Sequence, residues 1–207
     1  MTIKTTLLAL ILASTVSLTG FASVPGSAEA TQALAAGTPA PDVALRTVNG
    51  DATTLANELG GKPAILIFYR GGWCPYCNRH LGELQELEAE LLALGYRILA
   101  ISLDRPEKLA ETAGELETTY TLLSDSSAEA AKAFGLAFTV DAETIEKYHG
   151  YGIDLEKASG EPHHILPVPA AFIIDPDGII RFSYANPDYR VRIDPEALIE
   201  AAKAARE

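Results

Sequence analysis

The two cysteines of the chain lie within residues 73–77, whose sequence is Trp-Cys-Pro-Tyr-Cys, and this run constrains the fold more than any other stretch. Residues 64–69, just before it, are an apolar run rich in strand formers, typical of a strand buried on both faces. Gly71 and Gly72 allow a tight turn, and Pro75 suits the first position of a helix. The helix is indicated by leucines on one face, at positions 81, 84, 87, 91 and 94. The cysteines are therefore predicted at a strand-to-helix junction.

This position has a chemical consequence for the cysteines. A cysteine at the start of a helix lies near the positive end of the helix dipole and near unpaired backbone N–H groups, which both favour the thiolate. Cys74 and Cys77 are three positions apart, close enough for one sulfur to attack the other when it is oxidised. The alternatives are half of a zinc site or two inert buried thiols, but zinc would need about two more ligands at motif spacing. The sequence contains no other cysteine, so a redox-active pair is favoured.

The N-terminal residues 1–30 have the pattern of a secretory signal peptide. Lys4 supplies the positive start, residues 7–13 open an apolar segment, and residues 28–30, Ala-Glu-Ala, form a small-x-small cleavage site. An uncleaved membrane anchor is the alternative. The apolar stretch is interrupted by serines and threonines and is short for a membrane span. We therefore expect an exported protein, periplasmic or extracellular.

The remainder of the chain reads as a linker, residues 31–41, followed by one domain, residues 42–207. The net charge is −12 at pH 7 and no basic stretch is present, which argues against nucleic-acid binding. Export would place the cysteine pair outside the reducing cytosol, so the dithiol would need an electron donor there or rest oxidised. No membrane contact is expected after removal of the signal, and a homodimer is kept as an option.

Strands and helices alternate along the predicted domain. Strands are expected at residues 42–48, 64–69, 96–103, 121–123, 171–174 and 179–184, and helices at 54–59, 75–94, 106–116, 128–134, 142–148 and 195–205. Residues 150–167 are expected to form an irregular insert. This order predicts an α/β fold, a thioredoxin-like three-layer sandwich with a central mixed β-sheet flanked by helices.

Residues 68–81, with residues 168–175 and 177–178, resemble the peroxiredoxin-like branch of the alkyl hydroperoxide reductase and thiol-specific antioxidant (AhpC/TSA) family of the thioredoxin superfamily. The resemblance covers about residues 37–204 and implies a peroxiredoxin-type sandwich. It also implies a thiol peroxidase that reduces a hydroperoxide substrate with electrons from a thioredoxin-like or other thiol donor. The Cys-x-x-Cys spacing itself is of the thioredoxin type.

The chain departs from the family's peroxidatic motif, which has a proline, a threonine four residues later and the reactive cysteine three residues after that. Laid on this sequence, the motif places the reactive cysteine at Cys77, the threonine position at Cys74 and the proline position at Arg70. The family's distal arginine falls at Pro169. Because the missing groups normally donate to the peroxide oxygens, their loss should reduce the rate. Arg70 either offers a substitute guanidinium or lies on the surface, and Val168-Pro169 resembles the cis-proline that faces the cysteines in thioredoxins.

Two reaction routes are compatible with these residues. In the first, Cys77 attacks a hydroperoxide and becomes a sulfenic acid, with which Cys74 condenses to a disulfide. In the second, the more accessible Cys74 attacks a substrate disulfide and Cys77 resolves the mixed disulfide. We expect an exported thiol peroxidase, with a thiol–disulfide oxidoreductase acting on protein disulfides as the alternative.

Three neighbours of the cysteines complete the predicted site. Trp73 is expected to shield the pair and contact a partner, or else to pack as a core aromatic. Pro75 begins the helix, and Tyr76 either tunes the exposure of the cysteines or is a surface tyrosine.

Four polar residues outside the motif have less specific interpretations. His163 or His164 could complete a copper site with the cysteines, as in redoxin-fold copper chaperones, although exposed loop histidines are favoured. Asp104 and Asp125 follow strands and are proton relays or, more commonly, helix caps. No glycine-rich phosphate loop is present, so neither a cofactor nor a metal is expected.

Overall fold

The computed structural model describes residues 23–206 of the chain. The predicted signal peptide therefore lies outside the described residues as far as residue 22. The strands are β1 (Ala44–Thr47), β2 (Ala52–Thr54), β3 (Ala64–Phe68), β4 (Arg97–Ser102), β5 (Thr121–Ser124), β6 (Ala137–Thr139), β7 (Ile165–Pro167), β8 (Ala170–Ile174) and β9 (Ile180–Ala185). The helices are α1 (Leu55–Leu59), α2 (Pro75–Ala93), α3 (Pro106–Leu116), α4 (Glu129–Ala133), α5 (Ala142–Gly150), α6 (Leu155–Ser159) and α7 (Pro195–Ala204), and a 3-10 turn, η1, spans Ala28–Ala30.

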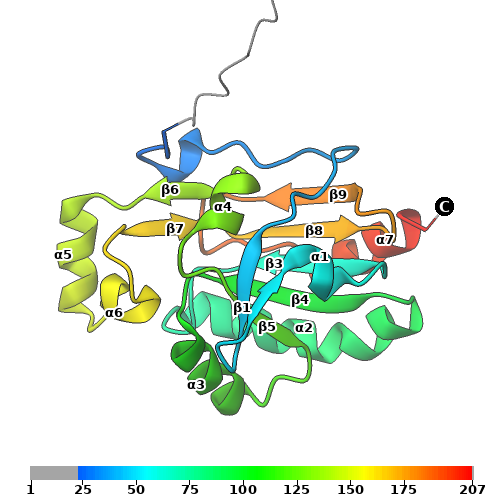
Figure 1. The fold of residues 1–207 in the computed structure, drawn as a ribbon, viewed down its shortest axis with the longest axis horizontal. Coiled ribbons are helices and arrows are strands. Elements are labelled where there is room, and N and C mark those ends of the chain that lie inside the picture. Colours follow the sequence, from blue (N-terminus) through cyan, green and yellow to red (C-terminus); the bar gives the residue numbers. More distant parts are fainter. Residues whose placement is uncertain (1–22, 207) are drawn as a thin grey trace, which may run out of the picture.

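A seven-stranded mixed sheet in the order β2-β1-β5-β4-β3-β8-β9 forms the middle layer (Figure 1). β3 runs parallel to β4 and antiparallel to β8, so it is hydrogen-bonded on both edges. All five of its side chains are buried, as its unbroken apolar sequence predicts. The strand that leads to the cysteines is therefore held on every side.

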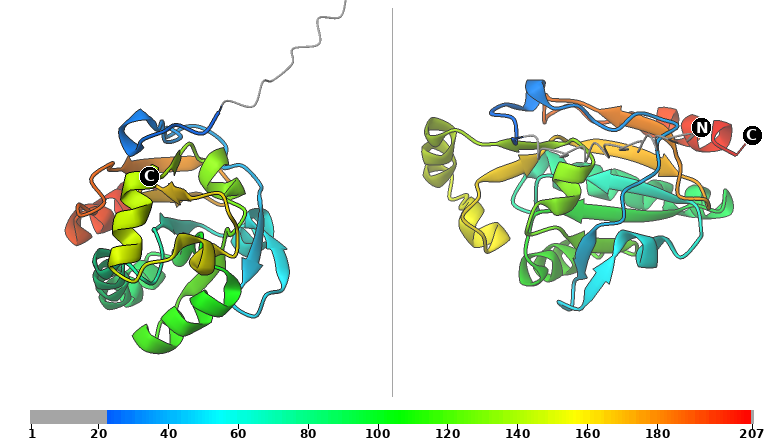
Figure 2. Two further views of the ribbon diagram at one scale, coloured as in Figure 1. Left: turned by 90° about the vertical axis from the view of Figure 1, so that its left-hand side faces the viewer. Right: turned by 45° about the horizontal axis from the view of Figure 1, so that its top comes forward.

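Helices cover both faces of this sheet (Figure 2). Ile65 and Ile67 of β3 pack in one core cluster with leucines of α2, α3 and α7. Leu66 and Phe68 pack in a second cluster with α1 and α4. Burying each of these side chains contributes roughly 1.5–3 kcal/mol relative to exposure. The predicted three-layer thioredoxin-like sandwich is confirmed by this arrangement.

Residues 23–30, predicted from the sequence as the end of the signal peptide, pack against the domain. The Thr139 N–H, in β6, donates to the Pro25 carbonyl at 2.8 Å. Val24 packs against a small buried cluster that includes Leu103 and Ile165. The predicted linker is held in the same way, since its Gln32 N–H donates to a backbone carbonyl at 3.1 Å.

The expectation of an irregular insert over residues 150–167 is wrong in part. The segment contains α6 and β7, and β7 pairs with β6 in a separate two-stranded sheet. Each of these strands has three residues, which is too short for an alternating pattern to be recognised. α5 and α6 lie together beyond one end of the large sheet, at the left of Figure 1.

Within residues 23–206, no helix combines the length and the apolar character that crossing a bilayer requires.

Candidate active site

Both cysteines lie in the first turn of α2, as the sequence predicts. Cys74 is the N-cap residue of the helix and Pro75 takes its first position. The Cys77 N–H donates to the Cys74 carbonyl at 2.9 Å, which fixes the two residues relative to each other. Both are free thiols, with Cys74 only 2% exposed and Cys77 fully buried. The pair is thus adjacent and shielded from bulk water.

The two sulfurs share one ionisation. The side-chain hydrogen bond from Cys77, with added support from the guanidinium charges of Arg70 and Arg192, lowers the pKa of Cys74 to about 6 despite its burial. Burial, and then the neighbouring Cys74, raises the pKa of Cys77 well above its ordinary value. The less buried sulfur at the helix N-terminus therefore holds the negative charge, and the Cys77 thiol donates to it.

Arg192, which no sequence motif indicates, contacts the buried cysteine. Its Nη2 lies 3.3 Å from the Cys77 Sγ, and its Nη1 donates to the carbonyls of Tyr189 and Val191. These bonds fix the guanidinium beside the sulfur. His80, the next buried polar side chain on α2, remains neutral because burial and then the charge of Arg192 lower its pKa to about 4. Arg192 lies in the segment between β9 and α7, 115 positions from Cys77, so nothing local to the motif could have identified it.

Arg70 is buried beside the pair, so the expectation of a surface arginine is wrong. It is 4% exposed, and its Nη2 donates to the hydroxyl of Tyr148 in α5. Its guanidinium carbon lies 5.0 Å from the ring centre of Trp73, 5.4 Å from that of Tyr148 and 4.2 Å from that of Tyr189. A desolvated guanidinium within this range of aromatic faces is stabilised by cation–π attraction. The interpretation of Arg70 as a substitute guanidinium is compatible with this position.

The other predicted neighbours lie around this arginine. Trp73 is half-buried and packs against Tyr148, with ring centres 5.9 Å apart. Tyr76 is 38% exposed and meets Tyr189 edge-on at 5.8 Å, so it is a surface residue that also packs. Pro169 lines a cavity together with Arg70. The Val168–Pro169 bond is trans, since the described residues contain no cis peptide bond, and the resemblance to a cis-proline does not extend to its geometry.

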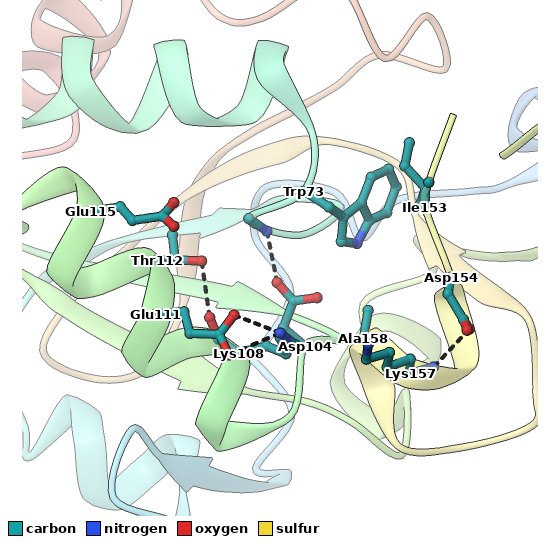
Figure 3. A pocket seen from close by; sticks show the side chains of 12 residues that line it. Trp73, Asp104, Lys108, Glu111, Thr112, Glu115, Ile153, Asp154, Lys157 and Ala158 are labelled. Atoms are coloured by element: carbon teal, nitrogen blue, oxygen red, sulfur yellow. Dashed lines mark hydrogen bonds and ion pairs between the residues drawn. The ribbon is translucent and has the colours of Figure 1, made fainter. Parts of the chain in front are cut away.

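The Gly71-Gly72 turn is held by Asp104, which follows β4. The Gly72 N–H donates to Asp104 Oδ2 at 2.7 Å, and both border a polar pocket of about 270 Å³ (Figure 3). Gly71 has φ +152°, and a Cβ added there would lie 2.3 Å from Trp73 Nε1. Burial raises the pKa of Asp104 to about 7. Asp104 is therefore no helix cap, since it braces the backbone that leads into Cys74.

Asp125 is a helix cap, which is the more common of the two interpretations that its sequence position allows. Its two carboxylate oxygens accept from the N–H groups of Ala130 and Ala131, in α4, at 2.9 and 2.8 Å. The cap is buried, and burial raises the pKa of Asp125 to about 7.

The two histidines are engaged within their own surroundings. His163 Nδ1 accepts from the Ile165 N–H at 3.0 Å, and its Nε2 donates to the Ser126 carbonyl at 2.8 Å. His164 Nε2 lies 2.9 Å from a carboxylate oxygen of Glu156. Between residues 23 and 206 no group of three or more His, Cys, Asp or Glu side chains is arranged to hold a metal ion.

Comparison with known proteins gives relatives of two kinds. The chain is 32% identical over 103 residues to peroxiredoxin Bcp of Escherichia coli, a match that covers 50% of this chain and 65% of that protein. It is 26% identical over 149 residues to the thiol-disulfide oxidoreductase ResA of Geobacillus kaustophilus, which covers 72% of this chain and 68% of ResA. The matched part thus spans about two thirds of each curated relative.

Solved structures and a family model complete the comparison. The crystal structure of peroxidoxin BcpB from Mycobacterium tuberculosis superposes with a TM-score of 0.64 at 21% identity, covering 84% of this chain and 97% of that one. This likeness supports the peroxiredoxin-type fold. Residues 36–183 match the model of the AhpC/TSA family, and this range includes β3, both cysteines and Pro169. The chain belongs to the AhpC/TSA family.

Proposed function

We propose that this protein is a thiol-dependent peroxidase that reduces a hydroperoxide through a dithiol/disulfide cycle of Cys74 and Cys77. One observation carries the proposal: two adjacent cysteines lie in the N-terminal turn of a helix with a guanidinium 3.3 Å from the Cys77 sulfur, and the Cys77 hydrogen bond and two guanidinium charges lower the pKa of Cys74. Thiolates attack peroxides, and a neighbouring thiol captures the product. Membership of the family and similarity to a protein named as a peroxiredoxin support the same activity.

The charge distribution supports the following roles for the two sulfurs. The Cys74 thiolate attacks one peroxide oxygen, so that an S–O bond forms, the O–O bond breaks, and the departing alkoxide takes a proton to leave as an alcohol. The Cys77 sulfur then attacks the Cys74 sulfenic acid, which forms the disulfide and releases water. The position of the family motif favoured Cys77 as the attacking sulfur. Its raised pKa and complete burial favour it as the resolving one.

The two arginines replace groups that the family motif supplies elsewhere. Arg192 beside Cys77 partly opposes the rise that burial causes in the pKa of that sulfur, which assists its attack on the sulfenic acid. Arg70 acts in the same way on Cys74. A thioredoxin-like or other thiol donor would restore the dithiol by exchange.

A second candidate is a thiol–disulfide oxidoreductase, which the similarity to ResA favours. A thiolate at Cys74 with a buried partner thiol suits attack on a disulfide as well as on a peroxide. Two assays of the reduced protein, peroxide consumption and insulin reduction, both with dithiothreitol as donor, distinguish the peroxidase from the thiol–disulfide oxidoreductase. Turnover of hydrogen peroxide or tert-butyl hydroperoxide without reduction of insulin supports the peroxidase, and insulin reduction without peroxide turnover refutes it.

The export of the protein remains part of this proposal and rests on the sequence pattern of residues 1–30. Expression of the full chain in a bacterial host, followed by fractionation and intact mass measurement, tests it. A processed chain in the periplasm or medium is the expected result. A full-length chain confined to the cytosol would contradict export. The same mass locates the cleavage site, and removal up to Ala30 would also remove the packed residues 23–30.

A further inference from the structure

Four side chains from three separate parts of the chain converge above the cysteine pair, and we call them the Arg70 cluster: Arg70, Trp73, Tyr148 and Tyr189. The Arg70 guanidinium contacts all three rings and donates to the Tyr148 hydroxyl. Tyr148 comes from α5 and Tyr189 from the segment between β9 and α7. A single buried arginine thus ties α5 and this segment to the turn that precedes Cys74.

The cluster lies next to the buried cysteines. A helix N-cap in this position would ordinarily be open to solvent, yet Cys74 is 2% exposed. Arg70 lies near enough for its charge to lower the pKa of Cys74. The segment that carries Tyr189 also carries Arg192, whose guanidinium contacts Cys77. The cluster and the segment that carries Tyr189 therefore lie beside both sulfurs.

A cavity of about 230 Å³ borders the cluster. In the described part of the chain, three cluster members line it, Arg70, Tyr148 and Tyr189, but neither cysteine does. Apolar and proline side chains also line it, among them Phe138, Pro167 and Pro169. Sites for drug-sized ligands measure roughly 300–1,000 Å³, so this cavity suits a smaller molecule. Asp141 adds an acidic group to the lining, and the chain carries a charge of −12, which disfavours an anionic ligand. Residues 26–29 also line this cavity, so cleavage after Ala30 would leave it wider on that side.

We propose that the Arg70 cluster is a size gate, which admits small uncharged hydroperoxides from the adjacent cavity to Cys74 and excludes protein disulfides. The choice of a hydroperoxide rests on the proposed function, whereas the size limit does not. A molecule in the cavity would contact Arg70, Tyr148 and Tyr189, and a shift of these side chains would bring it towards the sulfurs.

Two maleimides of different size measure the gate without any peroxide. N-ethylmaleimide is small, and a maleimide on a long polyethylene glycol chain has the same reactive group on a bulky carrier. The measured quantity is the rate constant for labelling of Cys74 by the small maleimide divided by that for the large one, in the reduced protein. It is compared with the same ratio for glutathione. A side-chain shift is enough to admit the small reagent, whereas the large one needs a wider opening. If that wider opening is populated for about 0.1–10% of the time, the ratio exceeds that of glutathione by roughly tenfold or more.

Variants of the cluster locate the effect. Tyr148→Ala and Tyr189→Ala should bring the ratio towards that of glutathione, and Tyr148→Phe, which loses only the bond to Arg70, should lie between. The matched control is Tyr151→Ala, because Tyr151 follows α5 directly and is 68% exposed. It should keep the wild-type ratio. Circular dichroism verifies folding, and if one alanine variant is unfolded the other carries the comparison.

The outcomes separate the gate from the proposed activity. A wild-type ratio equal to that of glutathione overturns the gate, and so does an unchanged ratio in both folded alanine variants. Because labelling needs no peroxide turnover, a protein without peroxidase activity could still show the gate. Insulin reduction gained in Tyr148→Ala, and faster turnover of tert-butyl hydroperoxide than of an anionic fatty-acid hydroperoxide, support the stated selectivity. Equal turnover of the two hydroperoxides refutes the preference for uncharged substrates.

Discussion

Arg192 provides the sharpest test of the electrostatics at the cysteine pair, because its charge reaches Cys77 from a distant segment. In Arg192→Met the side chain keeps most of its length but loses its charge. The guanidinium lies 3.3 Å from the Cys77 Sγ. A full charge on that sulfur would interact with Arg192 by roughly 5 kcal/mol at an effective dielectric constant of about 20.

The expected effect is smaller because the resting charge lies on Cys74. Arg192 is the last of the causes that lower the pKa of Cys74, and its side chain is half-exposed. We therefore expect roughly 1–2 kcal/mol to remain, which corresponds to a rise of about one in the first apparent pKa of the pair. The two thiols titrate as one system, so this macroscopic value is what an experiment reports.

Ultraviolet absorbance of the thiolate, followed against pH in the reduced protein, measures that value. Wild type should show its first transition near pH 6, where the pKa of Cys74 lies, and Arg192→Met should shift this transition to higher pH. Arg192→Lys should recover part of the shift. Arg190→Met is the matched control, because Arg190 lies in the same segment but pairs with Asp188 at 2.8 Å. An unshifted transition in Arg192→Met, or an equal shift in Arg190→Met, would refute the role of this charge.

Three further perturbations test other parts of the account. Cys74→Ser should lower the rate of peroxide consumption to that of a free thiol, whereas Cys77→Ser should leave a sulfenic acid on Cys74 that dimedone traps; trapping on Cys77 instead would reverse the assigned roles. Gly72→Ala should destabilise the fold by about 1–3 kcal/mol in urea unfolding, since its Cβ would lie 1.9 Å from Thr112 Oγ1, and the loss should shrink in a Thr112→Ala background. Asp104→Asn keeps an acceptor for the Gly72 N–H but removes a carboxylate whose pKa rises on folding from 3.8 to about 7. Because wild type loses stability as pH rises through that window, the variant should gain up to roughly 4 kcal/mol over wild type at about pH 8 and little below about pH 4, and equal unfolding curves at both pH values would contradict this.

The scaffold of the site could be predicted because its signals are local. The unbroken apolar run before the cysteines and the leucine spacing after them are periodic patterns, and β3 and α2 end within one residue of the predicted bounds. Pro75 and the N-cap position of Cys74 followed from the chemistry of helix starts. From these elements the depressed pKa of the site could also be foreseen.

The residues that enclose the site could not be predicted because no local pattern marks them. Tyr148 lies in a polar helix, and Tyr189 and Arg192 lie in an irregular segment between β9 and α7. They reach Cys74 and Arg70 only through the path of the whole chain. The family motif placed the distal arginine at Pro169, whereas the fold brings a guanidinium from Arg192. A motif assigns roles by spacing, but the charge beside a buried sulfur depends on packing.

The central claim is that the two cysteines react as one dithiol with a hydroperoxide. A single-turnover experiment tests it directly: fully reduced protein is mixed with one equivalent of hydrogen peroxide, and free thiols and intact mass are followed in time. The account predicts the loss of both thiols per peroxide consumed, a mass decrease of two hydrogens, and a rate well above that of free cysteine. Two thiols that persist, or that disappear no faster than those of free cysteine, would contradict it.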